Sequence, residues 1–307
     1  MVRKFCGVML FAAMASVAAA QSAEPTASEA ASLVQVETKG NQAVSASTFT
    51  LQVDGRTTPI QGLSPIQPQN LEVALLIDDG ARRGLSLQLG DLDAFIKELP
   101  PGVKVLVGYM SNGTVMSVGR FSADKEAVAK QLRIPFGIPG LSASPYFCLS
   151  EFVKHWPSNV PAARIVLMIT NGVDLYNGST SIMNQNSPYV QTAGDDAQRA
   201  GVVVYPLYYG DAGIYGMRNN FSGQSYLQQI ADATGGESLY GGTITPVSFK
   251  PYLDTFVKQL EGTYVMNFQL PPVKREHSGS LLRMHVKSNE KGIKVRSPQN
   301  VVVEGVE

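Results

Sequence analysis

The chain has 307 residues, with 25 Lys and Arg against 25 Asp and Glu, and only 16% of its residues are charged. The chain is poor in charge, because a typical globular domain carries about 25% charged residues. Its 44% of hydrophobic residues is nevertheless too high for a disordered chain. The balanced charge argues against a nucleic-acid partner. Three His and two Cys leave little material for a soft-metal site.

Residues 1–20 have the pattern of a secretory signal peptide. Arg3 and Lys4 come before an apolar run that starts at Phe5, and three alanines end the segment. The run is shorter than the roughly 20 apolar residues of a membrane span. Its removal leaves 23 basic against 25 acidic residues and a single cysteine, Cys148. We therefore expect an exported protein, periplasmic or secreted, with no membrane span and no intrachain disulfide.

The next part of the chain predicts short β-strands. Residues 21–32 are small and polar and predict a flexible lead-in. Alternating segments then follow at 32–38, 47–53 and 57–63, with a turn at Asp54–Gly55. These segments form an expected N-terminal β arm, residues 33–68.

From residue 71 to residue 262 strands and helices alternate, which predicts an α/β fold with a doubly wound, mostly parallel sheet and helices on both faces. The expected strands are 71–79, 103–110 with a hairpin partner at 114–121, 163–170 and 202–210. The expected helices are 85–99, 122–134 with Ser122 as cap, 145–156, 190–201, 225–236 and 248–262.

Beyond residue 262 the pattern returns to β, at 263–270, 280–288 and 292–304. Residues 263–307 are therefore an expected C-terminal β arm. Because the two ends of a domain usually lie close together, we expect the two arms to form one small β package.

In an open α/β sheet, ligands bind beyond the carboxyl ends of the strands. We call this edge the rim. The loops expected there contribute several polar and aromatic side chains, which form the candidate ligand-binding set: Asp78, Asp79, Arg82, Ser142, Ser144, Asn171, Asp174, Tyr176, Asp211, Tyr215 and Arg218. The sequence contains neither a nucleotide-binding glycine fingerprint nor a nucleophile-elbow motif.

At the segments VALLIDDG, ARIVLMITNG and VVVYPLYYG the sequence resembles the von Willebrand factor type A (VWFA) fold, in particular the bacterial VWFA-related domains named for Acidobacteria. The resemblance covers about residues 71–262, and the flanking β arms match that family's layout. It implies a Mg²⁺ held by an Asp-x-Ser-x-Ser motif after the first strand, a Thr before the third helix and an Asp after the fourth strand.

This chain departs from the implied metal motif. Asp78 matches the first Asp, but the two serine positions are Gly80 and Arg82, the Thr position falls on Ser142 or Ser144, and the last Asp is Asn171. Mg²⁺ prefers hard oxygen ligands that include one or two carboxylates, and the Arg82 guanidinium would bring a permanent positive charge. We therefore predict a degenerate site with neither metal nor cofactor. Asp79, Asp174 and Asp211 leave Mg²⁺ open as an alternative.

Three functions are consistent with these residues. The first, which we favour, is a secreted, non-enzymatic, adhesion-type module that binds a protein, or alternatively a polysaccharide, at the rim. In it Arg82 would receive a partner carboxylate, supported by Asn171 and Ser142. The second is a cell-envelope hydrolase that uses Asp78 and Asp79 or Cys148, although no nucleophile–base pair is evident. The third is a purely structural scaffold.

Overall fold

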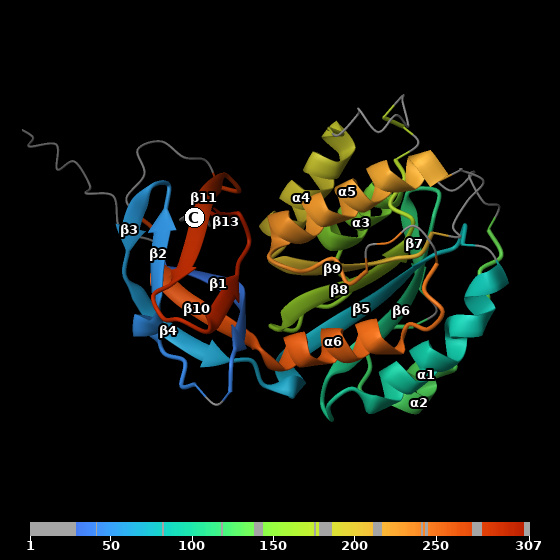
Figure 1. The fold of residues 1–307 in the computed structure, drawn as a ribbon, viewed down its shortest axis with the longest axis horizontal. Coiled ribbons are helices and arrows are strands. Elements are labelled where there is room, and N and C mark those ends of the chain that lie inside the picture. Colours follow the sequence, from blue (N-terminus) through green and yellow to red (C-terminus); the bar gives the residue numbers. More distant parts are fainter. Residues whose placement is uncertain are drawn as a thin grey trace, which may run out of the picture.

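A computed structural model describes residues 29–40, 42–81, 83–117, 119–137, 144–174, 176–177, 186–210, 217–240, 242, 245–271 and 278–303, with only the backbone described at Arg83 and residues 217–221. A β package and an α/β unit lie side by side (Figure 1).

The α/β unit is built on a five-stranded sheet of order β7-β6-β5-β8-β9, in which only β7 is antiparallel. Its strands are β5 (Leu71–Asp78), β6 (Lys104–Ser111), β7 (Thr114–Ser117), β8 (Ala163–Thr170) and β9 (Val202–Tyr208). The chain runs from β5 to β6 on one side and later to β8 on the other, which places a topological switch point at the end of β5. The predicted doubly wound sheet is confirmed.

Helices cover both faces of this sheet (Figure 1). Helices α3 (Pro145–Lys154), α4 (Pro188–Arg199) and α5 (Met217–Thr234) pack on one face, and α1 (Leu89–Glu98), α2 (Lys125–Ala129) and α6 (Lys250–Glu261) pack on the other. Each face has its own apolar core, because buried parallel strands present hydrophobic side chains on both sides.

Two expected helices differ from the structure. Residues 83–88 form a 3₁₀-helix, η3 (Arg83–Gln88), before α1 begins. Helix α2 is much shorter than the expected 122–134, and its cap is Asp124, whose carboxylate accepts from the Ala127 N–H at 3.0 Å. Ser122 instead pairs with Val105 at the edge of the sheet. Pro135 disfavours a helical residue 134 and is the sequence signal that the helix must end early.

The β package consists of two four-stranded antiparallel sheets, of order β12-β1-β10-β4 and β13-β11-β2-β3. The N-terminal strands are β1 (Glu29–Thr38), β2 (Phe49–Val53), β3 (Arg56–Thr58) and β4 (Ile60–Pro65). The C-terminal strands are β10 (Thr263–Gln269), β11 (Leu281–Ser288), β12 (Ile293–Arg296) and β13 (Asn300–Val302). Both arms therefore contribute to both sheets around one apolar core. Strand β1 begins at Glu29, so the last four residues of the expected lead-in are strand.

Two hairpins have the turn chemistry that their sequence predicts. Asp54 and Gly55 join β2 to β3 with φ of 50° and 76°, and Asn112 and Gly113 join β6 to β7 with φ of 51° and 77°. Positive φ at both central residues defines the tight turn that Asn-Gly and Asp-Gly favour.

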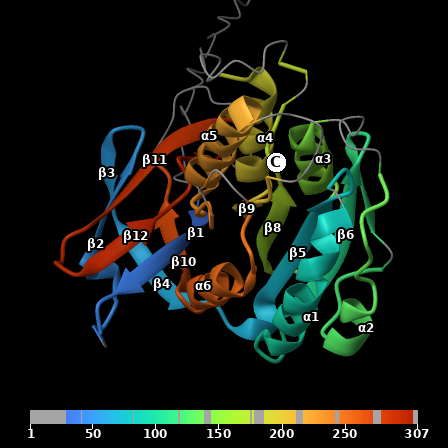
Figure 2. The same ribbon diagram turned by 45° about the vertical axis from the view of Figure 1, so that its right-hand side comes forward.

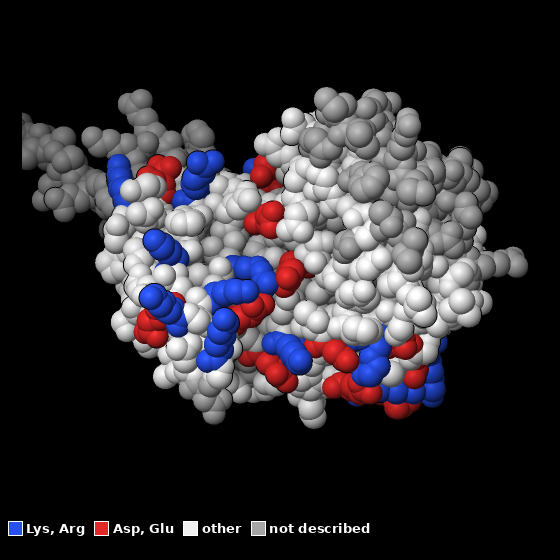
Figure 3. Space-filling model, viewed as in Figure 1, with Lys and Arg blue, Asp and Glu red and all other residues white. Residues whose placement is uncertain are grey.

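Helix α6 leads directly into β10 and lies at the junction of the two parts (Figures 1 and 2). On the face shown in Figure 3, basic and acidic side chains are interspersed over the β package and along the lower edge. Ion pairs form within α1 between Lys97 and Asp93 and within α6 between Lys250 and Asp254, both at 3.0 Å. Exposed pairs of this kind contribute little to stability. The charges that this view shows on described residues are mixed in sign.

Candidate functional site

Asp78 lies at the switch point, at the end of β5 between β6 and β8. Its Oδ2 accepts a hydrogen bond from the Thr170 Oγ1 hydroxyl at 2.7 Å, and its Oδ1 accepts from the Gly80 N–H at 2.9 Å. Burial raises the pKa of the Asp78 carboxyl above its ordinary value, the two hydrogen bonds oppose this rise, and the charge of Asp79 adds to it. The hydrogen bonds from the chain itself therefore engage both carboxylate oxygens.

Asp79 pairs with Arg133, a residue that the sequence analysis did not single out. The Asp79 Oδ1 accepts from the Arg133 guanidinium at 2.7 Å and from the Phe136 N–H at 3.3 Å. The guanidinium lies between the rings of Tyr109 and Phe136, at 3.7 and 3.9 Å from their centroids. Only 3% of Asp79 is exposed. This residue holds the segment that follows α2 against the rim and is not free to bind a ligand.

The loop after β8 is closed by its own side chains. The Asn171 Oδ1 accepts from the Val173 N–H at 2.9 Å. Asp174 accepts from the Ser187 hydroxyl at 2.5 Å and from the Tyr176 N–H at 3.2 Å. Asn171 and Asp174 are both buried, so their polar atoms shape the loop instead of facing a partner.

Ser144 and Cys148 lie in the interior below the rim. Ser144 is fully buried and caps α3, its Oγ accepting from the Tyr146 N–H at 3.3 Å. Burial raises the pKa of the Cys148 thiol to about 12, and the negative charge of Asp78 adds to the effect. A thiol with this pKa is almost entirely protonated at neutral pH and is a poor nucleophile.

The described histidines lie away from these groups. His155 is exposed and contacts Glu151, with Nδ1 and Oε1 3.1 Å apart, and His285 lies on the exposed face of β11. Within the described ranges, no His contacts Asp78, Asp79 or Cys148, so the hydrolase alternative has no nucleophile–base pair there.

Several expected rim residues fall outside the described part of the chain. These are Arg82, Ser142, Asp211 and Tyr215, together with the side chain of Arg218. Their proposed roles stay predictions.

The side chains that are described do not fit a Mg²⁺ site. Position 80 has no side chain, Asn171 bonds within its own loop, and the carboxylates of Asp79 and Asp174 are held by their own donors. Asp78 is the remaining carboxylate, and it too is hydrogen-bonded. Among the described residues, no three His, Cys, Asp or Glu side chains come together as a metal-binding group.

An aromatic cluster lies at the same edge, and the sequence predicted only one of its members. The rings of Tyr176 and Tyr189 both meet Phe147 edge-on, with centroids 5.1 and 4.9 Å away. Tyr176 is 56% exposed, whereas the other two rings are half-buried. The Tyr176 ring therefore packs against Phe147 while much of its surface stays exposed. We call these three residues the rim aromatic cluster.

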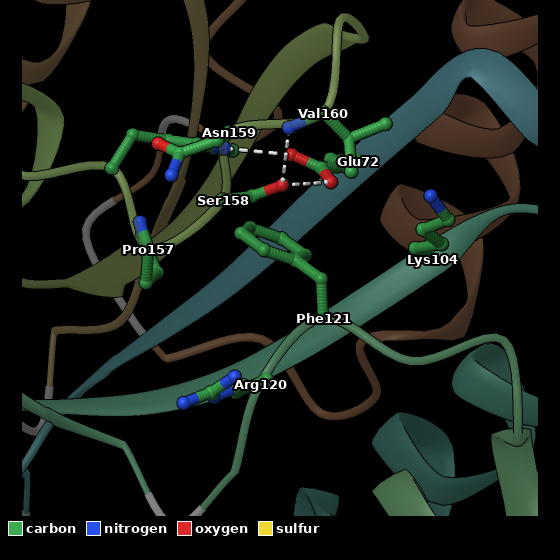
Figure 4. A pocket seen from close by; sticks show the side chains of 9 residues that line it. Glu72, Lys104, Arg120, Phe121, Pro157, Ser158, Asn159 and Val160 are labelled. Carbon is green, nitrogen blue, oxygen red and sulfur yellow. Dashed lines mark hydrogen bonds between the residues drawn. The ribbon is translucent and has the colours of Figure 1, made fainter.

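A second polar site lies at the opposite, amino end of the sheet (Figure 4). There Glu72, which is 1% exposed, accepts from the Trp156 Nε1–H at 2.8 Å and from the Ser158 hydroxyl at 2.7 Å. The Trp156 ring stacks on Phe121 with centroids 5.0 Å apart. The adjoining pocket has a volume of about 590 Å³. The carboxylate oxygens of Glu72 are engaged by the protein itself, and the side chains of Lys104 and Arg120 also line this pocket.

The fold and the rim together define a doubly wound α/β module in which the described rim carboxylates, those of Asp78, Asp79 and Asp174, are engaged by its own chain. No protein-family model matches the chain, and no curated protein matches it. The described part of the chain contains no helix long and apolar enough to cross a membrane.

Solved structures with a similar fold exist. An aerotolerance-related membrane protein from Bacteroides fragilis, with multiple mutations to serines, is 13% identical with a TM-score of 0.45, over 62% of this chain and 98% of that one. BatB from Bacteroides thetaiotaomicron is 12% identical with a TM-score of 0.44, over 62% and 97%. A von Willebrand factor type A protein from Catenulispora acidiphila is 14% identical with a TM-score of 0.42, over 92% and 75%. At these identities and TM-scores the likeness concerns the fold alone.

Proposed function

We propose that this protein is an exported, non-enzymatic binding module that recognises a protein partner at the rim without a metal ion. The observation that carries the proposal is the rim aromatic cluster, in which Tyr176 is mostly exposed and rests on Phe147. Aromatic side chains that are already ordered lose little entropy on binding and are enriched in protein interfaces.

The polar groups of the rim support the same function. Asp78, Asp79 and Asp174 all accept hydrogen bonds from their own chain, so they neither gather a cation nor form an acid–base pair. A partner would therefore contact the aromatic cluster and the side chains around it. In this proposal Arg82 receives an acidic group of the partner, and export follows from the signal-peptide pattern of residues 1–20.

The test compares immobilised wild-type protein with three variants, each incubated with envelope extract of the source cells. Tyr176→Ser removes the exposed ring and Arg82→Glu reverses the charge. Val160→Ser is the matched control, because Val160 is 45% exposed but precedes β8 at the amino end of the sheet. We expect the wild type and Val160→Ser to capture the same proteins in EDTA, and the two rim variants to capture at least about ten-fold less.

Equal capture by all four proteins would contradict a partner site at the rim. Capture that EDTA abolishes would contradict the metal-free mechanism while leaving the rim as the site. If Arg82→Glu captures as well as the wild type while Tyr176→Ser does not, Arg82 takes no part in binding and the aromatic cluster remains the proposed site.

A further inference from the structure

The β package has a strand edge that is covered along only half its length. Strand β1 pairs with β10 from Glu29 to Gln35, but on its other side it pairs with β12 only from Gln35 to Thr38. Beyond Arg296 the chain leaves β12 through Pro298, which has no N–H to donate. Among the described residues, no strand therefore pairs with the edge of β1 over residues 29–34.

The register shows which backbone groups point to this open side. The Val36 N–H donates to the Gly262 carbonyl at 2.9 Å, so the even-numbered residues of β1 face β10. In an antiparallel pair the groups that face the partner alternate, and the N–H groups of Ala31 and Leu33 therefore point to the open side. Neither N–H finds a backbone acceptor in the described ranges, and the Leu33 carbonyl accepts only a 3.4 Å contact from its neighbour, the Ser32 hydroxyl.

Strand β13 presents a second open edge to the same space. The Gln299 carbonyl accepts from the Met284 N–H at 2.7 Å and the Val303 N–H donates to the Ser280 carbonyl at 2.9 Å. The odd-numbered residues of this strand therefore face β11, and the backbone groups of Asn300 and Val302 point away from it.

Both edges border one cleft of about 660 Å³ between the β package and the amino ends of β8 and β9. Its walls are largely apolar and include Leu33, Ile66, Ala162, Val265 and Val302. None of the described residues that line it is charged. An occupant must therefore be uncharged and apolar along its buried side, because an unpaired charge buried there would cost several kcal/mol.

We propose that this cleft binds an uncharged, extended peptide segment of a partner protein, which adds as a strand to the open edge of β1. Unsatisfied N–H groups spaced two residues apart are the template that strand addition uses, and apolar pockets then select the alternate side chains. Charge argues against the chain's own terminal segments as occupants, since residues 304–307 carry Glu304 and Glu307 and residues 21–28 carry Glu24 next to Pro25.

The probe for the first test is the blocked peptide acetyl-Val-Thr-Val-Thr-Val-amide, titrated into the purified protein while amide hydrogen exchange is followed by NMR. We expect the amides of Ala31 and Leu33 to exchange at least ten-fold more slowly with the peptide bound. The amides of Ser32 and Val34, which face β10, should not change. A peptide with N-methylated amide bonds should give no protection, because it cannot pair with a strand.

The matched variants are Ala31→Pro and Thr57→Pro. Ala31→Pro removes the N–H that faces the cleft and leaves the ladder to β10 intact, so the protein should fold. Thr57 is exposed on the edge strand β3, opposite Gln52 of β2. The Asp54 N–H donates to the Arg283 carbonyl, so the even-numbered residues of β2 face β11, and the Thr57 N–H opposite Gln52 therefore faces outward. We expect Ala31→Pro to weaken peptide binding at least ten-fold and Thr57→Pro to leave it unchanged.

Three results would overturn the proposal. The first is the absence of protection at millimolar peptide, and the second is an unchanged peptide affinity in Ala31→Pro. The third is protection of Ala31 and Leu33 without peptide that disappears when residues 21–28 are deleted, which would make the chain's own lead-in the occupant. None of these results bears on the rim, which lies at the opposite end of the sheet.

Discussion

The two ends of the central sheet differ in which polar groups the chain satisfies by itself. At the carboxyl end the carboxylates of Asp78, Asp79 and Asp174 each accept hydrogen bonds from the same chain. At the amino end Glu72 is likewise engaged, but the backbone edge of β1, which borders a separate cleft there, has N–H groups without described partners. The amino-end cleft therefore offers a ligand backbone donors without described partners, whereas the rim offers exposed side chains such as Tyr176.

The largest effect expected at the carboxyl end is that of Asp79→Ala. It would leave the Arg133 guanidinium between two aromatic rings without its counter-charge, and removing one partner of a buried ion pair costs about 3 kcal/mol. Because 28% of the Arg133 side chain is exposed, we expect about 2–3 kcal/mol less stability in urea unfolding. The double variant Asp79→Ala/Arg133→Met should recover part of this loss. A loss below about 0.5 kcal/mol would mean that the pair does not hold the rim.

At the amino end we expect a smaller loss, about 2 kcal/mol, for Glu72→Ala. This change leaves the buried Trp156 Nε1–H and the Ser158 hydroxyl without their acceptor. Glu72→Gln keeps one acceptor and should cost less. Unfolding can be followed by the fluorescence of Trp156, the single tryptophan of the chain. Equal losses for the two variants would show that packing and not hydrogen bonding is lost.

Asp78→Asn tests the charge at the switch point through pH. Burial raises the pKa of Asp78 above its ordinary 3.8, so the folded state holds the proton more tightly than the unfolded chain does. The contribution of Asp78 to stability is therefore fully present below pH 3.8 and is lost as the pH rises through the raised pKa. Asn does not titrate. As the pH rises from 3 to 7, the free energy of unfolding of the variant should therefore increase relative to that of the wild type, by about 1 kcal/mol or less. A wild type that becomes more stable relative to the variant as the pH rises would contradict the raised pKa.

The smallest expected effect is that of divalent cations. The described side chains do not fit a Mg²⁺ site, so Mg²⁺, Mn²⁺ or Ca²⁺ should leave the melting temperature in EDTA unchanged within about 1 °C. A ligand at 100 times its Kd would add about 2.7 kcal/mol. A clear rise with one cation would show that the rim holds metal, and recognition of an acidic partner group through the ion would replace the mechanism proposed here.

Much of the fold was predictable because buried parallel strands are long apolar runs and tight turns need particular residues. The run ARIVLMIT gave β8 with the expected bounds, and Asp54–Gly55 and Asn112–Gly113 gave their hairpins. Helix boundaries were less predictable. Helix α5 begins at Met217, eight residues before the expected start, and α2 ends long before Arg133.

The order of the elements and the position of Asp78 at the end of β5 could be predicted because they depend on local hydrophobic patterns and turn residues. The joining of both arms in one β package could be predicted because the ends of a domain usually lie close together. Which side chains meet at the two ends of the sheet depends instead on tertiary packing. Arg133 reaches Asp79 across 54 positions and Trp156 reaches Glu72 across 84. Such pairs depend on how helices and strands pack, and no local pattern records them. The open edge of β1 was also decided by the tertiary structure, since it depends on where β12 stops pairing.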